Sequence, residues 1–392
     1  MQKIGICACY DTENYGSMLQ ALALCRRLEQ TGRTYEIIRY TRKAVPPLVL
    51  KSLDRIPEKL KKQLKKQREA RQLAQYPAVQ AGLQARRRRF SDFRQNAFPN
   101  LSTPCDTFRQ LQQAAVQYTA VLAGSDQIWL PQGYATGFYT LQFVPDHIPK
   151  ISYAASFGVS RIPARKRRAA ACFLRRMDHI SVREIRGAEI VQELTGRVVP
   201  VLPDPALLFD AAGWADLIPE TPPAAPAGQA WIFCYLLGDN PQHRSQVQQL
   251  AHATGLPVVT VPHLDGFVPG DVGFGNYELY EIGPAEFLNL IRNAAMVCTD
   301  SFHGTVFSIL HHRPFVTFDR FAAESRQSRN SRIDTLLLQT GLQARRIRKN
   351  TEICAVMQAP IDYAAVDAGL AALRQDALAW LEDVLPECGG ER

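Results

Sequence analysis

The chain has 392 residues, of which 46% are hydrophobic and 21% charged, and at roughly 150 residues per domain this length predicts two globular domains. The lack of a long apolar run excludes a membrane-spanning helix and a signal peptide, and the nine cysteines form no C-x-x-C pair, so we expect a cytoplasmic protein with reduced thiols. The formal net charge of +9 is unevenly spread, because residues 51–94 hold 14 Lys and Arg against 4 Asp and Glu.

The first half alternates β-rich runs with helical periodicity. A strand over residues 4–10 precedes a polar loop, a helix over 18–28 and a second strand over 35–40. Further runs predict buried strands at 116–123, 151–155 and 180–182 and a helix at 184–194. We therefore expect residues 1–205 to form an N-terminal Rossmann-like domain, with a basic helical insertion at about 45–100.

The basic insertion is open to two interpretations. Residues 57–71 can form a helix with Leu60 and Leu64 on one side, and four consecutive arginines follow at 86–89. Such a helix could rest on the anionic inner face of the membrane, as a peripheral contact, or it could be a solvated insertion. Because aromatic residues are not interleaved with the charges, we expect no nucleic acid partner.

The second half repeats the alternation. A Pro/Ala-rich stretch at 219–228 predicts an interdomain linker, which we place at residues 206–228. We then expect residues 229–392 to form a C-terminal Rossmann-like domain that ends in a long amphipathic helix over 366–384. The expected strands lie at 231–237, 257–261, 296–299 and 315–318, and the expected helices at 243–253, 284–295, 305–311 and 333–338.

These repeated βα units predict the α/β class, with two parallel-sheet, Rossmann-like domains facing a cleft. Ligands of such sheets bind outside the carboxyl ends of the strands. The sequence has no Walker phosphate loop, no H-E-x-x-H and no zinc-type Cys/His spacing, so we expect no metal or other cofactor. The loops after the strands therefore carry the candidate site residues.

The first candidate loop is Thr-Asp-Ser-Phe-His-Gly-Thr at 299–305, which follows a buried strand and opens a helix. Such a junction favours anions, Gly304 would let a ligand approach the backbone, and Ser301 or Thr305 can cap the helix. His303 would lie at the mouth of this site, where an imidazole can transfer a proton. The alternative is a polar turn whose histidine bonds locally.

Four other segments are weaker candidates, and each has a purely structural alternative. One places Ser125, Asp126 and Gln127 at a strand end, and another places Asn14, Tyr15 and Gly16 at the first βα junction. Arg183 and Glu184 follow a further buried strand, where an arginine suits phosphate or carboxylate. Arg329 and Arg332 could clamp an acidic ligand or stay solvated.

Six phrases in order along the chain are more specific than any one loop. They are N-Y-G-S-x-L-Q-A, G-S-D-Q-I-W, I-S-Y-A-A-S-F-G, S-V-R-E, L-P-D-P and T-D-S-F-H-G-T. From about residue 4 to 342, apart from the basic segment, the chain resembles the polysaccharide pyruvyl transferase family. The resemblance implies a fold similar to two-domain GT-B glycosyltransferases.

The resemblance also implies phosphoenolpyruvate as donor, and as acceptor a sugar of a cell-surface glycan or a lipid-linked oligosaccharide precursor. It assigns donor contacts to His303, Gly304 and Arg183, whereas some relatives carry a second arginine where this chain has Ser301. Arg329 or Arg332 could replace that charge, and Asp126 and Glu184 are both open as the catalytic base. The alternatives are a GT-B glycosyltransferase using a nucleotide sugar and a non-catalytic glycan-binding relative.

Overall fold

The computed structural model describes residues 3–41, 67–222, 225, 228–263, 266–321, 330–348 and 351–387. Most of the helix expected at 57–71 lies outside these residues, and so does Arg329. Within the described part of the chain, no helix is both long and apolar enough to cross a bilayer.

The first sheet is built from the first half of the chain, and its described strands are all parallel. Their order is β2-β1-β3-β4-β5. The strands are β1 (Lys3–Cys7), β2 (Tyr35–Ile37), β3 (Tyr118–Ala123), β4 (Lys150–Ala155) and β5 (His179–Val182). Each lies within or overlaps an expected strand, because strands buried on both faces are continuous apolar runs. The helices of this half include α1 (Tyr15–Gln30), α3 (Pro77–Ala97), α4 (Phe108–Ala115), α5 (Ala164–Arg176) and α6 (Ile185–Thr195).

The second sheet comes from the second half, and its described strands are parallel in the order β11-β10-β9-β6-β7-β8. The strands are β6 (Ile232–Tyr235), β7 (Val258–Thr260), β8 (Tyr277–Glu278), β9 (Met296–Thr299), β10 (Phe315–Phe318) and β11 (Arg346–Ile347). The helices are α8 (Pro241–Thr254), α9 (Pro284–Asn293), α10 (Phe302–Leu310), α11 (Ser331–Gln339), α12 (Ile353–Gln358) and α13 (Tyr363–Val384). Two such sheets confirm the expected fold class.

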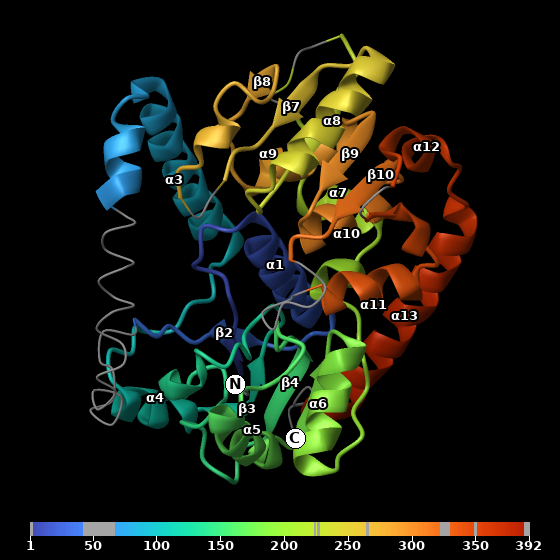
Figure 1. The fold of residues 1–392 in the computed structure, drawn as a ribbon. Helices are drawn as coiled ribbons and strands as arrows, with labels where there is room; N and C mark the ends of the chain where they lie inside the picture. Colours follow the sequence, from blue (N-terminus) through green and yellow to red (C-terminus); the bar gives the residue numbers. More distant parts are fainter. Residues whose placement is uncertain are drawn as a thin grey trace.

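Helix α1 lies between the two sheets (Figure 1). Residues 15–25 are all buried, so this helix has no solvent-facing stripe over most of its length. Its apolar side chains belong to one hydrophobic cluster that also includes residues of α9 and α10 in the second half. The same cluster thus joins both halves of the molecule, and α1 contributes to the core of each.

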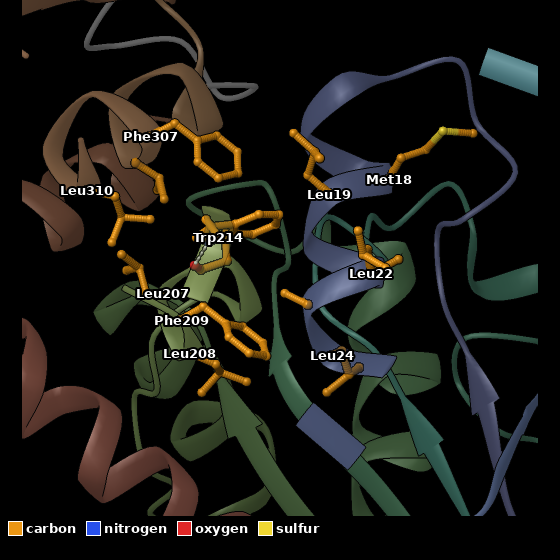
Figure 2. Close-up of a cluster of buried hydrophobic side chains, with 14 of the residues drawn as sticks. Met18, Leu19, Leu22, Leu24, Leu207, Leu208, Phe209, Trp214, Phe307 and Leu310 are labelled. Atoms are coloured by element: carbon orange, nitrogen blue, oxygen red, sulfur yellow. Dashed lines mark hydrogen bonds between the residues drawn. The ribbon is translucent and has the colours of Figure 1, made fainter. Parts of the chain in front are cut away.

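The segment expected as a linker contains two short helices, η4 (Pro205–Leu208) and α7 (Ala211–Leu217). Trp214 of α7 is fully buried and meets the Phe307 ring of α10 edge to face, with 5.0 Å between centroids. Its indole N–H donates to the carbonyl of Ala206 at 2.8 Å. Figure 2 shows Trp214 among side chains of α1, η4 and α10. The first part of the segment therefore packs in the core between the sheets.

Helix α13 runs along one side of the molecule from the second sheet toward the first (Figure 1). Arg33, which follows α1, forms an ion pair with Glu382 of this helix at 2.7 Å. Arg374 donates to the carbonyl of Leu207 at 3.0 Å. The expected long amphipathic helix is present, and its apolar face covers residues of the first half.

Helix α3 connects the two halves of the molecule through arginines of the run at 86–89, for which the sequence allowed either membrane contact or a solvated helix. Arg86 is buried and donates to the carbonyls of Pro262, His263 and Leu279 at 3.0–3.2 Å. Arg89 pairs with Glu286, and Arg87 lies 3.7 Å from a carboxylate oxygen of Glu13. These three arginines serve contacts within the protein, so this part of the basic segment is not a purely solvated helix. Peripheral membrane contact by the rest stays a prediction.

Candidate functional site

The points at which strand order reverses in the two sheets face each other. In the first sheet the reversal lies between β1 and β3, and in the second between β6 and β9. Open α/β sheets bind ligands in the crevice at this point. Here the loops that follow all four strands line one cavity of about 100 Å³. Its lining residues are Asn14, Asp126, Gln127, Leu237, Asp300, Ser301, Phe302, His303, Arg320, Phe321, Asn330, Arg332 and Ile333.

Asp126 projects into this cavity from the loop after β3. Its backbone is left-handed, with φ at 75°, a conformation that is costly for a residue with a β-carbon. The Ser17 hydroxyl donates to Asp126 Oδ2 at 2.5 Å, and Arg183 Nη2 lies 3.3 Å from Oδ1. Two partners therefore fix the orientation of this carboxylate.

Arg183 is buried beneath the cavity and binds two carboxylates. It pairs with Asp126 on one side and with Asp204 on the other, and its guanidinium lies 4.4 Å from the centre of the Phe302 ring. Asp204 also accepts from the Ala206 N–H at 3.0 Å and lies 3.5 Å from His303 Nε2. Asp126, Arg183, Asp204 and His303 thus form a continuous chain of charged and titratable groups.

The electrostatics follow from this chain. Burial opposes ionisation of Asp204, but His303 and Arg183 outweigh it and hold the pKa of Asp204 well below its usual value. Burial likewise opposes ionisation of Asp126, whereas Arg183, His303 and the Ser17 hydroxyl lower its pKa overall. Both carboxylates are therefore ionised at neutral pH. The pKa of Arg183 is raised, because the two carboxylates outweigh its burial.

His303 is positioned by the start of α10. Ser301 is the N-cap, and its hydroxyl accepts the Gly304 N–H at 3.2 Å, as one of the two expected caps. The imidazole lies against the backbone of Gly16, where a β-carbon would be only 2.1 Å from Nδ1. A β-carbon at Gly304 would lie 2.7 Å from Thr299 Oγ1, so the second glycine permits close packing of α10 on β9.

Two arginines and a second carboxylate complete the cavity lining. Arg332, in the first turn of α11, and Arg320, which follows β10, both line it. The Arg332 guanidinium lies 5.6 Å from the centre of the Phe302 ring. Asp300 is buried, and its two oxygens accept the N–H groups of Leu237 and Gly238 at 2.6 and 2.8 Å. This carboxylate ties the loop after β9 to the loop after β6.

The structure brings only some of the expected site residues to the cavity. Asn14, Asp126, Gln127, Ser301, His303 and Arg332 line it. Gly16 contacts His303 without lining the cavity, and Asn14 also caps α1 by accepting the Ser17 N–H at 3.0 Å. Arg183 lies beneath the cavity and binds Asp126, which is one of its lining residues.

The other expected site residues have structural partners elsewhere. Tyr15 is buried, stacks on Phe287 with 4.5 Å between ring centroids, and donates to the carbonyl of Ile282. The buried hydroxyl of Ser125 donates to the carbonyl of Ala154 at 2.7 Å, and that of Thr305 donates to the carbonyl of Ser301 at 3.0 Å.

Glu184 is also buried, and it lies outside the cavity lining. It accepts from the Ser156 hydroxyl at 2.9 Å and from the Phe157 N–H at 3.1 Å. Burial raises its pKa, although Arg183 and Arg332 act against that shift. A base role for Glu184 and donor contacts by Arg183 stay predictions.

Three charged residues of the site were not among the expected site residues: Asp204, Asp300 and Arg320. Asp204 lies in the L-P-D-P phrase and Asp300 in T-D-S-F-H-G-T, so both had a signal in the motifs, but no local pattern gives either a role. Arg320 follows a strand end within an ordinary run of residues and carried no signal. In the described ranges, no cluster of three or more His, Cys, Asp or Glu side chains is arranged to hold a metal ion.

Comparison with known proteins identifies the fold and the family. The structure is similar to that of S. aureus MnaA with UDP, with a TM-score of 0.51 and 14% identity over 96% of this chain and 91% of that chain. UDP-GlcNAc 2-epimerase from Methanocaldococcus jannaschii matches with a TM-score of 0.49 and 10% identity over 91% and 98% of the two chains. The fold is thus of the GT-B type, as expected. No curated protein matches the sequence.

A family model described as polysaccharide pyruvyl transferase matches residues 14–320, from the first βα junction through Arg320. This range includes the cavity residues from Asn14 to Arg320 and the charged chain from Asp126 to His303. The match covers well over half of the 392 residues. The chain therefore belongs to the polysaccharide pyruvyl transferase family.

Proposed function

We propose that the protein transfers pyruvate from phosphoenolpyruvate to two hydroxyls of a sugar, in a cell-surface glycan or its lipid-linked precursor, with release of phosphate. The observation that carries the proposal is the cavity that loops of both sheets line together. It combines two arginines, a histidine and an oriented carboxylate, Asp126. The match to the pyruvyl transferase model supports pyruvyl as the transferred group and a polysaccharide as the class of acceptor.

The donor is a dianionic or trianionic molecule that needs cations and N–H donors around it. Arg320 and Arg332 supply two guanidiniums, each of which can bind phosphate or carboxylate through parallel N–H groups. The N-terminus of α10 adds free backbone N–H groups at the same wall. Arg332 thereby supplies the positive charge that some relatives carry as an arginine at the position of Ser301.

The transfer needs one proton at carbon and one base. Protonation of the donor's methylene carbon forms the methyl group and leaves an oxocarbenium-like centre, which the first sugar hydroxyl attacks. Loss of phosphate and attack by the second hydroxyl close the ketal. Of the two hydroxyl protons, one balances the new C–H bond and the other leaves with phosphate.

His303 and Asp126 are the side chains of the cavity lining that we assign to these two proton transfers. Imidazole transfers protons near neutral pH, so His303 is assigned to protonation of the methylene carbon. Asp126 is ionised and lines the cavity, so it accepts the proton of the attacking hydroxyl. Arg183 and Ser17 act as positioning residues, because they hold the Asp126 carboxylate from two sides.

The donor assignment is tested by thermal unfolding with phosphoenolpyruvate and, in parallel, with UDP- and GDP-sugars. At a hundredfold excess over its dissociation constant, a bound ligand stabilises the fold by about 2.7 kcal/mol. We expect a shift with phosphoenolpyruvate that Arg332→Gln and Arg320→Gln reduce, and that Arg88→Gln, on the exposed face of α3, leaves unchanged. A shift with nucleotide sugars alone would favour the glycosyltransferase alternative and overturn the proposal.

The chemical step is tested with the same donor and a glycan acceptor by measuring phosphate release. We expect His303→Gln and Asp126→Asn each to lower kcat by about 100-fold or more, the usual contribution of a general acid or base. Glu184→Gln tests which of the two carboxylates, Asp126 or Glu184, is the base, because Glu184 lies outside the cavity lining. A loss of kcat in Glu184→Gln, with Asp126→Asn close to wild type, would reverse the assignment of the base.

A further inference from the structure

A second cavity of about 350 Å³ opens beside the site, at the carboxyl ends of β1 and β2. Its volume falls within the roughly 300–1,000 Å³ of small-molecule sites. The residues that give it chemical character are Tyr10, Arg39, Tyr40, Arg94, Phe138 and Tyr139. They come from the loops after β1 and β2, from the bridging helix α3 and from the segment before β4.

The walls are aromatic. Tyr40 and Phe138 lie with ring centroids 5.5 Å apart, and Phe138 and Tyr139 lie 4.9 Å apart. Tyr10, with 8% of its surface exposed, meets the Phe98 ring edge to face. Rigid aromatic side chains with hydroxyl tips present both an apolar surface and hydrogen-bonding groups. This combination matches a sugar ring, which has C–H faces and a rim of hydroxyls.

The rim of this cavity is cationic. Arg39 and Arg94 both line it, and they come from different elements. Among the lining residues, the exposed Asp11 is the one that carries a carboxylate. Both guanidiniums act on the Tyr10 hydroxyl: burial and Asp11 raise the pKa of Tyr10, whereas Arg39 and Arg94 lower it. In the part of the chain that the structure describes, the arginines that form ion pairs with carboxylates do not include Arg39 or Arg94. Two cations around an aromatic pocket favour a ligand that carries negative charge.

The two cavities share one loop. Tyr10 and Asp11 line the second cavity, and Asn14 lines the first. Three residues of extended chain span at most about 11 Å, so the rims of the two cavities lie within the length of a disaccharide or less. A molecule of disaccharide length held in the second cavity can therefore extend to Asn14 at the first cavity, which Asp126 also lines.

We propose that the second cavity binds the acceptor, and that the acceptor is a glycan whose sugar unit carries an anionic group, a carboxylate or a phosphate, held by Arg39 and Arg94. The inference rests on the proposed function, because it takes the first cavity as the donor site. The aromatic walls hold the ring, and the two arginines set its orientation by binding the charged group. The anion has two sources, a uronic acid within the glycan or the phosphate of a glycosyl phosphate.

The test is binding of three probes to the full chain by calorimetry or ligand-observed NMR: glucose 1-phosphate, glucuronic acid and glucose. We expect an anionic probe to bind more tightly than glucose. Arg39→Gln and Arg94→Gln should each weaken that probe at least tenfold, whereas Arg109→Gln, an exposed arginine of α4, should leave its affinity unchanged. Preference for glucose 1-phosphate indicates a glycosyl phosphate, and preference for glucuronic acid indicates a uronic acid.

Phosphoenolpyruvate affinity, measured on the same variants, separates the two proposals. If phosphoenolpyruvate binds with dependence on Arg332 but no sugar probe depends on Arg39 or Arg94, the acceptor inference is overturned and the donor site stands. If the probes depend on those arginines and phosphoenolpyruvate does not bind, the donor assignment fails instead. Equal binding of inorganic phosphate and glucose 1-phosphate, competition of the probe with phosphoenolpyruvate, or no binding of any probe would also overturn the acceptor site.

Discussion

The backbone of Gly16, at the start of α1, lies against the imidazole of His303, at the start of α10. A β-carbon at position 16 would be 2.1 Å from Nδ1 and 2.2 Å from Cγ of the ring, closer than any real contact. The absence of a side chain at Gly16 therefore allows the ring to lie between α1 and Asp204. The position of this histidine of the second half therefore depends on two residues of the first half, Gly16 and Asp204.

Gly16→Ala should displace the His303 ring and lower activity, and overpacking of this buried contact should also lower the free energy of unfolding by about 1–3 kcal/mol. A misplacement of about 1 Å at a reacting group can cost about 100-fold in rate. We expect a loss of that order in kcat, measured as phosphate release with phosphoenolpyruvate and an acceptor. Gly369→Ala, in the middle of α13 with no atom closer than 3.9 Å to the new β-carbon, is the control and should keep wild-type activity. Normal turnover in Gly16→Ala would show that the ring does not need its present position.

Asp204→Asn should destabilise the protein strongly. The substitution leaves the buried Arg183 with one carboxylate partner in place of two and removes the partner of His303. Breaking a buried ion pair in this way costs about 3–5 kcal/mol. Urea unfolding measures the loss, and Asp210→Asn is the matched control, because asparagine caps a helix as well as aspartate does. Equal unfolding midpoints for the two variants would contradict a central role for Asp204.

Arg86→Ala should loosen the contact of α3 with the second half of the chain. The substitution leaves the carbonyls of Pro262, His263 and Leu279 without their donor. We expect the free energy of unfolding to fall by about 2–3 kcal/mol, since buried groups lose charged hydrogen bonds. Arg88→Ala removes a neighbouring but exposed arginine and should change stability by no more than about 0.5 kcal/mol. If both variants lose the same amount, the carbonyl contacts do not hold α3.

His311, just after α10, should make stability depend on pH. Burial, with help from Arg292, Arg313 and His312, lowers its pKa to about 3, so the folded protein keeps this imidazole neutral. The unfolded chain takes up the proton below its ordinary pKa of about 6.5. Stability is therefore fully present above pH 6.5 and falls as the pH drops, by about 1.4 kcal/mol per pH unit between about pH 6 and 5.

The measurement is the free energy of urea unfolding from pH 7 to 5 for wild type, His311→Gln and His252→Gln. The first variant should flatten the curve, because it removes the titrating group. The second changes an exposed histidine of α8 and should retain the wild-type slope. Parallel curves for all three proteins would show that His311 is not the group responsible.

The sequence predicts most of the longer strands and several helices because each is a local pattern, whereas α4, α5, β8 and β11 are not among the expected elements. The expected strand at 296–299 and the expected helix from 184 correspond closely to β9 and α6. Apolar runs bounded by turns and 3.6-residue periodicity depend on near neighbours alone. The Ser301 cap is of the same kind, since the donor and the acceptor lie three residues apart.

The same patterns could not separate ligand contacts from core packing. Tyr15 and Gly16 are adjacent in one motif, yet Tyr15 stacks on Phe287 in the core and Gly16 makes room for His303. Arg86 and Arg88 belong to one run of arginines, yet the first is buried and the second exposed. In each pair the difference comes from residues that are remote in the chain.

The parallel-sheet class, the two-domain architecture and the resemblance to the family follow from the sequence by itself, because apolar runs, βα alternation and ordered motifs are local features of the chain, whereas the order of the strands in each sheet comes from the structure. The chain of contacts from Asp126 through Arg183 and Asp204 to His303 is a product of the tertiary structure. So is the entry of Arg320 into the cavity. The physical reason is that hydrogen bonds and ion pairs act over a few ångströms in space, and only the packing of α1 between the two sheets brings these distant residues to that distance.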